Sequence, residues 1–299
     1  MLTSKNTIAD FFADKLPSPL QKVNYNIYSD AGIEVYIKRD DLIDPIVSGN
    51  KWRKIKYTLI DCIQKSKNHI VTFGGAYSNH LPAVAKVCNA LGLKSTAFVR
   101  GDELTVNSNS HLQYCNSQGM ELIFVERHLY KNKRELVQQY YNDANNIYLV
   151  DEGGRGELGA KGCEDIITET DIDFDHIFVC VGTGTTLAGI ANAAAHKFSN
   201  TIVNGIVVLK GAEEIEKDIK ELCPLNNWVL HHDFHFGGYG KTNNELDNFI
   251  EKYILETGMH IEFAYTGKMF FGIEELTRTN YLKSGQKVLV VHTGGVDSK

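Results

Sequence analysis

The sequence predicts an α/β protein with two open, mainly parallel sheets, each covered by helices. Short β-branched runs are followed by glycine-containing turns and then by apolar residues at helical spacing, and this order recurs along the chain. The strand candidates are nearly continuous apolar runs, as in sheets that are buried on both faces. Their number exceeds what one open sheet usually holds, which favours two domains in a chain of 299 residues.

The expected strands and helices alternate from the first strand onward. The strands begin with one at Val35 and continue with 69–73, 95–99, 121–125, 147–150, 177–181, 202–209, 228–231 and 287–291. The clearest helical patterns cover 52–63, 81–91, 134–142 and 158–168. A glycine cluster at 153–159 either marks a crossing between domains or consists of ordinary turns.

Composition argues against several classes of protein. Lysine plus arginine number 31 and aspartate plus glutamate number 37, a net charge of −6, and the sequence has no basic stripe for nucleic acid. Apolar runs such as 288–291 are too short to cross a membrane, and residues 1–20 do not resemble a signal peptide. The 6 cysteines are scattered without metal-binding spacing, so we expect buried thiols, no metal and a cytoplasmic location.

A lysine in the first turn of a predicted helix is the first candidate for chemistry. Gly49 and Asn50 lead into this helix, and Lys51 follows them. The positive end of the helix dipole disfavours another positive charge, so we expect a lowered pKa for Lys51 and a neutral amine that attacks carbonyls. The alternative is a solvated face that Lys51 shares with Arg53, Lys54 and Lys56.

Two turns follow predicted strands at the end where open α/β sheets bind ligands. In the first turn, Ser78 and Asn79 precede helix 81–91 and either cap it or face a ligand. The second turn consists of Gly182, Thr183, Gly184, Thr185 and Thr186. Its backbone N–H groups at a helix start and its three hydroxyls predict a site for one phosphate. Neither the Walker GK[ST] nor the dinucleotide GxGxxG spacing is present there.

Three further candidates lie in glycine-rich settings. Thr293 follows strand 287–291, and Gly294 and Gly295 after it allow close approach of a flat ligand. Tyr239 lies in Gly-Gly-Tyr-Gly and Tyr265 in Ala-Tyr-Thr-Gly-Lys. For both tyrosines the alternative is an ordinary packing role.

In this order, the segments resemble the 1-aminocyclopropane-1-carboxylate deaminase/D-cysteine desulfhydrase family. These are pyridoxal-5′-phosphate enzymes of fold type II, the tryptophan synthase β-like fold. The resemblance rests on KRDDL, GNKWRK, SNH, the glycine/threonine turn, YTGK and HTGG, and extends from Pro17 to Gly295. It implies a larger cofactor-binding domain of residues 1–50 and 160–299, a smaller inserted domain of residues 51–159, and a cofactor in the cleft. It also implies a homodimer and a small amino-acid substrate.

The resemblance implies which residues bind the cofactor. Lys51 corresponds to the lysine that binds it covalently and later moves the Cα proton, and Asn79 to the residue that hydrogen-bonds its 3′-oxygen. Turn 182–186 corresponds to the phosphate loop, and Thr293 to the hydroxyl that faces the pyridine nitrogen. A hydroxyl there leaves this nitrogen largely unprotonated, which gives a moderate electron sink suited to elimination.

The resemblance also implies which residues act on the substrate. Ser78 corresponds to a catalytic serine near the substrate carboxylate. Tyr239 and Tyr265 correspond to two tyrosines that approach the substrate from the other side.

Three departures bear on the choice of substrate. The deaminase branch carries glutamate directly after the second tyrosine and the desulfhydrase branch threonine, so Thr266 favours D-cysteine. Tyr77 stands where both branches tend to have glutamine, and Thr185 where glycine is usual, which leaves the substrate open.

We therefore predict a D-cysteine desulfhydrase, which forms pyruvate, ammonia and hydrogen sulfide by α,β-elimination. The first alternative is a 1-aminocyclopropane-1-carboxylate deaminase, which forms 2-oxobutanoate and ammonia. Elimination or racemisation of another small amino acid is a further alternative. A non-catalytic binder of pyridoxal phosphate or of a phosphorylated metabolite is the alternative from another class.

Overall fold

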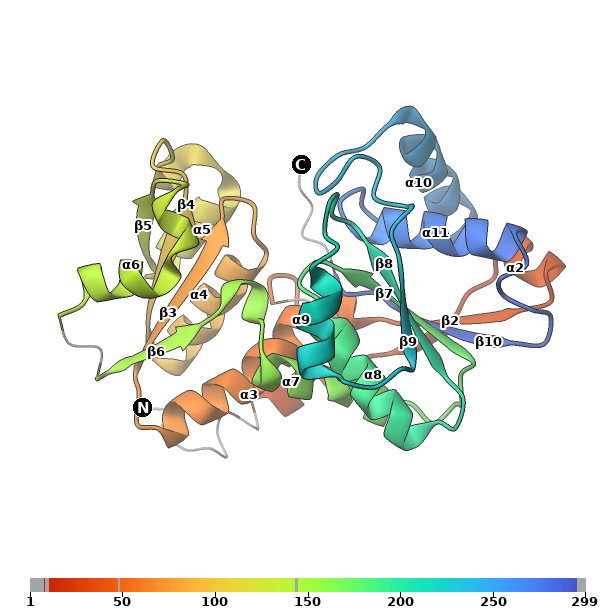
Figure 1. The fold of residues 1–299 in the computed structure, drawn as a ribbon, viewed down its shortest axis with the longest axis horizontal. Helices are drawn as coiled ribbons and strands as arrows, with labels where there is room; N and C mark the ends of the chain where they lie inside the picture. The colour runs from red at the N-terminus through yellow and green to blue at the C-terminus, as the bar shows by residue number, and fades with distance from the viewer. Residues whose placement is uncertain (1–7, 9–10, 48, 143–144, 295–299) are drawn as a thin grey trace. The chain divides into compact units, whose positions relative to one another are not determined.

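A computed structural model describes residue 8 and residues 11–47, 49–142 and 145–294, and Gly295 of the HTGG motif lies outside these residues. The chain divides into two compact units, each with one sheet (Figure 1). Unit 1 comprises the described parts of Met1–Leu16, Asp44–Val47 and Lys51–Gly159, and unit 2 those of Pro17–Ile43, Ser48–Asn50 and Ala160–Lys299. The predicted α/β class with mainly parallel sheets is confirmed.

The sheet of unit 1 is entirely parallel. Its strands, in spatial order, are β5 (Glu121–Val125), β4 (Lys94–Arg100), β3 (His69–Gly75) and β6 (Ile147–Val150). The helices of this part of the chain are α3 (Asn50–Gln64), α4 (His80–Leu91), α5 (Ser110–Ser117) and α6 (Lys133–Tyr140), with single turns η2 (Val106–Ser108), η3 (Leu129–Lys131) and η4 (Glu152–Gly154). Buried side chains such as Val71, Phe73 and Phe98 form the core on the sheet.

The order of these strands places a ligand-binding position at the end of β3. After β3, the next two strands, β4 and β5, lie on one side of it, and the later β6 lies on its other side. The carboxyl ends of β3 and β6 therefore form a topological switch point, where open α/β sheets bind ligands. The turn with Ser78 and Asn79 follows β3, and η4 follows β6.

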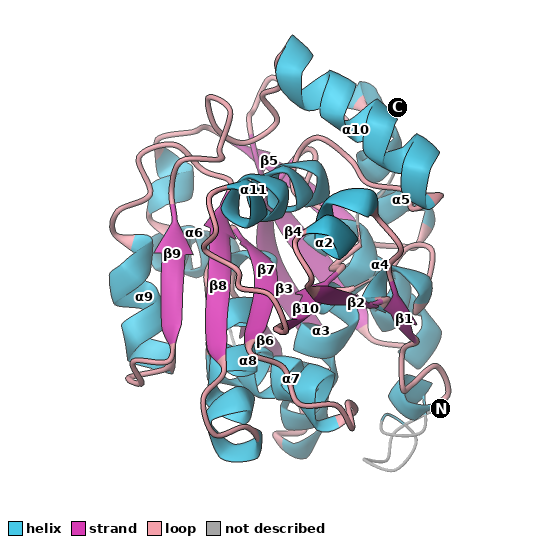
Figure 2. Ribbon diagram, turned by 90° about the vertical axis from the view of Figure 1, so that its right-hand side faces the viewer, coloured by secondary structure: helices cyan, strands magenta, loops and turns pink. Residues whose placement is uncertain are grey.

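The sheet of unit 2 is parallel except at one edge. Figure 2 shows its strands in the order β1 (Leu20–Lys22), β2 (Glu34–Lys38), β10 (Lys287–Val291), β7 (His176–Val181), β8 (Ile202–Val207) and β9 (Trp228–His231). Only the short β1 is antiparallel to its neighbour among these described strands. Here β7 has β8 on one side and β10 on the other, so the carboxyl ends of β7 and β10 form a second switch point.

Helices cover both faces of this sheet, as its continuous apolar strands predict. On one face α7 (Glu157–Thr168), α8 (Thr185–Lys197) and α9 (Ile215–Leu222) pack on alternate side chains such as Val179 and Val181. On the other face α2 (Asn26–Asp30), α10 (Asn244–Thr257) and α11 (Thr266–Arg278) pack on Phe178 and Cys180 (Figure 1). No helix among the residues that the structure describes is long and apolar enough to cross a membrane.

Candidate active site

Turn 182–186 lies at the switch point of unit 2 and has the features of an anion site. Gly184 is the N-cap of α8 with a φ of 74°, and an added Cβ would lie 2.4 Å from Ile219 Cγ1. Glycine cannot cap the first N–H groups of α8, which leaves them for a ligand. The first turn of α8 holds no acidic residue, and the hydroxyls of Thr183 and Thr185 lie 3.4 Å apart. These residues fit the phosphate of pyridoxal phosphate.

Asn50 ties the start of α3 to the two turns at this switch point. Its Nδ2 donates to Thr186 Oγ1 at 2.9 Å, and its backbone N–H donates to the carbonyl of Thr293 at 3.4 Å. Gly49 has a φ of 59°, and an added Cβ would lie 1.5 Å from the same carbonyl oxygen. Only glycine fits there, because both the φ and the contact exclude a side chain. Lys51 is the next residue in the chain and lies in the first turn of α3, as predicted.

The charged residues of the KRDDL motif hold the loop that precedes Gly49. Lys38 Nζ lies 2.8 Å from Glu169 Oε2 and donates to the carbonyl of Ser18 at 2.7 Å. Asp40 accepts from Ser18 Oγ at 2.6 Å through its carboxylate, and its carbonyl accepts from Gly49 N–H at 2.9 Å. The motif therefore has a structural role: its hydrogen bonds hold Gly49 next to the carbonyl of Thr293, which follows β10.

Tyr239 and Tyr265 meet beside the phosphate turn. Their ring centroids lie 5.4 Å apart at 63°, and a Cβ added at Gly182 would lie 3.7 Å from Tyr265 Cε1. Burial raises the pKa of both hydroxyls, and the neighbouring Tyr239 raises that of Tyr265 further. Both hydroxyls are therefore protonated at neutral pH and can donate hydrogen bonds, while the raised pKa makes them weaker acids than an unburied tyrosine.

Glu262 fixes the backbone that carries Tyr265. Its carboxylate accepts the N–H groups of Ala264 at 2.6 Å, Tyr265 at 3.0 Å and Thr266 at 2.8 Å. The hydroxyl of Thr266 accepts from Glu262 N–H at 2.9 Å and donates to Glu262 Oε1 at 3.1 Å. Position 266 carries no carboxylate, because its residue is threonine. Thr266 is also fully buried, so it affects the site only through its hydrogen bonds to Glu262 and through the neighbouring Tyr265.

Lys268 holds the loop that carries Tyr239. It is fully buried on α11, and its Nζ donates to the carbonyls of His235 at 2.9 Å and Gly238 at 2.7 Å. Burial lowers the pKa of Lys268, whereas the charge of Glu262 acts in the opposite direction. Glu262 and Lys268 thus fix the backbone on both sides of the tyrosine pair.

We expect Lys268→Met to lower the free energy of unfolding by about 2–4 kcal/mol, because the carbonyls of His235 and Gly238 lose their buried donor. Urea unfolding measures this change. Lys283→Met, at an exposed lysine, is the control and should change stability by less than about 0.5 kcal/mol. Equal stability of the two variants would show that Lys268 does not fix the loop.

The turn with Ser78 and Asn79 lies at the switch point of unit 1. Asn79 occupies the N-cap position of α4 but makes no capping hydrogen bond, and Ser78 Oγ accepts from His80 N–H at 3.3 Å. The side chain of Asn79 instead has its Oδ1 3.1 Å from Nε2 of His111. The two predicted alternatives were capping of the helix and contact with a ligand. Ser78 makes one long hydrogen bond to the start of α4, and Asn79 makes no capping hydrogen bond.

A buried neutral histidine follows this turn. His80 Nε2 lies 2.8 Å from Thr72 Oγ1, which donates its one proton to the carbonyl of Val150 at 2.8 Å. Nε2 of His80 therefore carries the hydrogen. Burial lowers the pKa of His80, and the charges of Lys51 and Lys54 lower it further. The charges of Lys51 and Lys54, in the first turns of α3, therefore lie close enough to the switch point of unit 1 to affect His80.

Three residues that support this arrangement were not singled out from the sequence for that role: Asn50, Glu262 and Lys268. Asn50 belongs to the GNKW motif and Lys268 to the YTGK motif, and these motifs could have indicated their importance from the sequence. The partners of Lys268 lie about thirty residues away in the chain, and only the fold reveals them.

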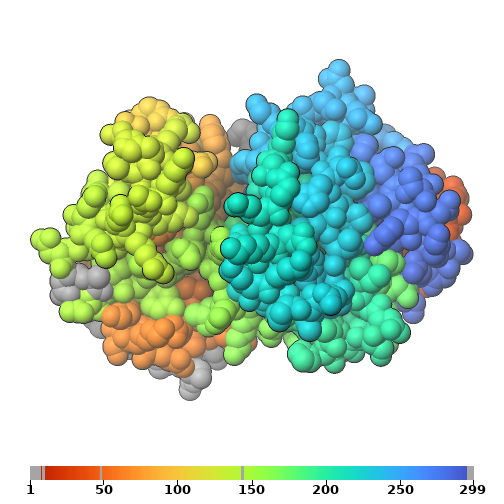
Figure 3. Space-filling view, in the orientation of Figure 1, coloured from red at the N-terminus to blue at the C-terminus, as the bar shows by residue number. Residues whose placement is uncertain are grey.

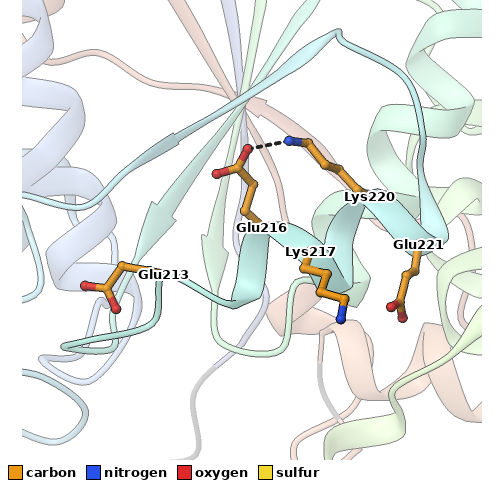
Figure 4. A pocket seen from close by; sticks show the side chains of 5 residues that line it. All are labelled: Glu213, Glu216, Lys217, Lys220 and Glu221. Atoms are coloured by element: carbon orange, nitrogen blue, oxygen red, sulfur yellow. Dashed lines mark hydrogen bonds and ion pairs between the residues drawn. The ribbon is translucent and has the colours of Figure 1, made fainter.

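The helix α9 lies on the face of the molecule drawn in Figure 3, and a surface depression along it is a separate feature (Figure 4). It is lined by five exposed charged residues: Glu213, Glu216, Lys217, Lys220 and Glu221. Lys220 and Glu216 form an ion pair at 2.7 Å, one turn apart on the helix. Exposed ion pairs of this kind contribute little to the free energy of folding. The depression shares no residue with the predicted site.

Comparison with known proteins decides the family. A family model described as pyridoxal-phosphate dependent enzyme matches residues 14–294. The chain belongs to this enzyme family. This pyridoxal-phosphate dependent enzyme is 31% identical over 288 residues to a Pyrococcus horikoshii protein provisionally named as a 1-aminocyclopropane-1-carboxylate deaminase. That alignment covers 91% of this chain and 87% of the relative.

Two further relatives connect the enzyme to both branches. A mitochondrial protein of Arabidopsis thaliana, named as a bifunctional D-cysteine desulfhydrase/1-aminocyclopropane-1-carboxylate deaminase, is 26% identical over 94% of this chain and 77% of its own length. A D-cysteine desulfhydrase of Serratia proteamaculans is 27% identical over 93% of this chain and 91% of its own length. The predicted cofactor and the resemblance to this group are thereby confirmed, and the chain is an enzyme by family.

Solved structures confirm the predicted fold type. The crystal structure of a 1-aminocyclopropane-1-carboxylate deaminase homologue matches with a TM-score of 0.78 and 28% identity, covering 96% of this chain and 94% of that one. Serine racemase of Dictyostelium discoideum matches with a TM-score of 0.69 at 17% identity, covering 99% of each chain, which shows a shared fold.

Proposed function

We propose that the enzyme catalyses the α,β-elimination of D-cysteine, which with one water yields pyruvate, ammonia and hydrogen sulfide. The observation that supports this substrate is the tyrosine pair beside Gly182, with a threonine rather than a carboxylate directly after Tyr265. A hydrogen-bond donor that faces the departing sulfur stabilises its developing negative charge, and both hydroxyls are protonated donors at neutral pH.

The proposed cofactor-binding residues divide by task. Turn 182–186 binds the phosphate through helix N–H groups and threonine hydroxyls. Asn79 donates to the 3′-oxygen of the cofactor, and the hydroxyl of Thr293 faces its pyridine nitrogen. Pyridoxal phosphate, when bound, supplies the electron sink for negative charge at the substrate Cα.

The proposed catalytic residues hold and move protons. Lys51 would hold the cofactor covalently through Nζ, and the same amine would serve as the base that takes the proton from the substrate Cα. Ser78 binds the substrate carboxylate, and Tyr239 and Tyr265 face the side chain. The thiol departs from Cβ with a proton, and the released enamine reacts with water to give pyruvate and ammonia.

The enzyme's organisation is part of the proposal. We assign residues 1–50 and 160–299 to a larger cofactor-binding domain and 51–159 to a smaller inserted domain. These bounds differ from the two compact units in one respect: the described parts of 1–16 and 44–47 group with 51–159. We also propose a homodimer, and a cytoplasmic location because the cysteines of the described residues are buried, as thiols in a reducing compartment usually are.

A second candidate is the deamination of 1-aminocyclopropane-1-carboxylate to 2-oxobutanoate and ammonia. The names of the Pyrococcus and Arabidopsis relatives favour it. In this reaction the Tyr265 hydroxyl would assist ring opening, with Glu262 holding its backbone rather than acting on the substrate.

The two activities are separated by parallel assays of the protein loaded with pyridoxal phosphate. We expect sulfide from D-cysteine with a kcat/KM at least about tenfold above the values for L-cysteine and for 1-aminocyclopropane-1-carboxylate. Sulfide and 2-oxobutanoate are measured separately, with Lys51→Ala as the blank. Formation of 2-oxobutanoate without sulfide would reject the D-cysteine proposal in favour of the second candidate.

A further inference from the structure

His111 lies against the turn that carries Ser78 and Asn79. It is the second residue of α5 and is 8% exposed, and its Nε2 lies 3.1 Å from Asn79 Oδ1. Both residues belong to unit 1. The resemblance assigns a role to Asn79 but none to His111.

The start of α5 is docked on this turn by further contacts. Asn109, the N-cap of α5, accepts from Leu112 N–H at 2.9 Å through Oδ1 and donates from Nδ2 to the carbonyl of Ala76 at 3.1 Å. The Tyr77 ring approaches the His111 ring edge-on, with centroids 6.5 Å apart. The position of His111 relative to Asn79 is therefore fixed by the hydrogen bond from the Asn109 side chain to the Ala76 carbonyl and by the ring contact with Tyr77.

The chemistry of this pair determines which end of the Asn79 amide remains available. Burial lowers the pKa of His111, so its imidazole is neutral and carries one hydrogen. An amide oxygen only accepts, so Nε2 of His111 is the donor in this contact. With its oxygen bound, Asn79 has its NH₂ group left for a ligand. If the Asn79 amide were turned the other way, its Oδ1 would face the 3′-oxygen of the cofactor, and two acceptor oxygens would oppose each other.

We propose that His111 is a positioning residue, which fixes the Asn79 amide so that its NH₂ group donates to the 3′-oxygen of pyridoxal phosphate. This inference rests on the proposed role of Asn79. It predicts that His111 contributes to cofactor binding only through Asn79 and that any side chain with an N–H donor of similar reach can replace it.

A double-mutant cycle on pyridoxal phosphate binding tests this proposal. His111→Leu is expected to raise the dissociation constant of pyridoxal phosphate from the apoprotein by about five- to tenfold and to shift the visible absorption band of the bound cofactor. His111→Gln should restore most of both. In an Asn79→Ala background, His111→Leu should add less than about twofold. His128→Leu, at an exposed histidine, is the control.

The outcomes separate this inference from the proposed function. Wild-type protein without affinity for pyridoxal phosphate would overturn both. If Asn79→Ala weakens binding but His111→Leu does not, the role of His111 is wrong while that of Asn79 stands. Independent, multiplicative effects of the two substitutions, or a His111→Gln variant no better than His111→Leu, would also overturn the positioning role.

Discussion

Replacing Lys51 with alanine is expected to lower kcat by about a thousandfold or more. The variant loses both the amine that binds the cofactor covalently and the base that takes the proton from Cα, and a positioned base alone contributes about 10²–10⁴-fold. Sulfide release from D-cysteine under saturating pyridoxal phosphate measures the loss.

The stability of the Lys51→Ala variant should be close to that of the wild type, because alanine favours the helix. Lys65→Ala is the control, since Lys65 lies just beyond the other end of α3, is exposed, and contacts Asp61 at 2.7 Å and the ring of Tyr148 rather than the predicted site. A Lys51→Ala variant within tenfold of wild-type turnover would refute the role of Lys51.

The second large effect is expected from Gly49→Ala. A Cβ at this position would lie 1.5 Å from the carbonyl oxygen of Thr293 and 2.0 Å from its carbonyl carbon, so the backbone must move. We expect a loss of about 3 kcal/mol or more in the free energy of unfolding, and a markedly weaker affinity for pyridoxal phosphate. Denaturant unfolding of the apoprotein and cofactor titration measure the two effects separately.

Gly92→Ala is the matched control for Gly49→Ala. Gly92 has a similar φ of 68°, but nothing lies within 4 Å of an added Cβ. Backbone strain alone should cost about 1 kcal/mol there and leave cofactor affinity unchanged. Equal losses in the two variants would show that contact with Thr293 does not explain why glycine occupies position 49.

The order of strands and helices was largely predictable because the strands are buried on both faces. β5, β6, β9 and β10 have the predicted bounds, because an acidic residue or a histidine follows each of these runs. β8 ends at Val207, two residues earlier than predicted. The three-residue β1 was not predicted, because its partly exposed side chains carry no strand pattern.

The candidate site was predictable where chemistry-bearing residues directly follow strands. Turn 182–186 and Thr293 lie at one switch point, and Ser78 and Asn79 lie at another. The contacts that orient these residues were not predictable, because their partners are distant in the chain. His111 lies 32 residues from Asn79, and no local pattern connects them.

The attachment point of the cofactor is the most direct test of the proposed chemistry. The protein is loaded with pyridoxal phosphate, reduced with borohydride and digested, and the labelled peptide is identified by mass spectrometry. We predict a single label on Lys51. A label on another lysine, or no label on protein that is saturated with the cofactor, would contradict the proposed function.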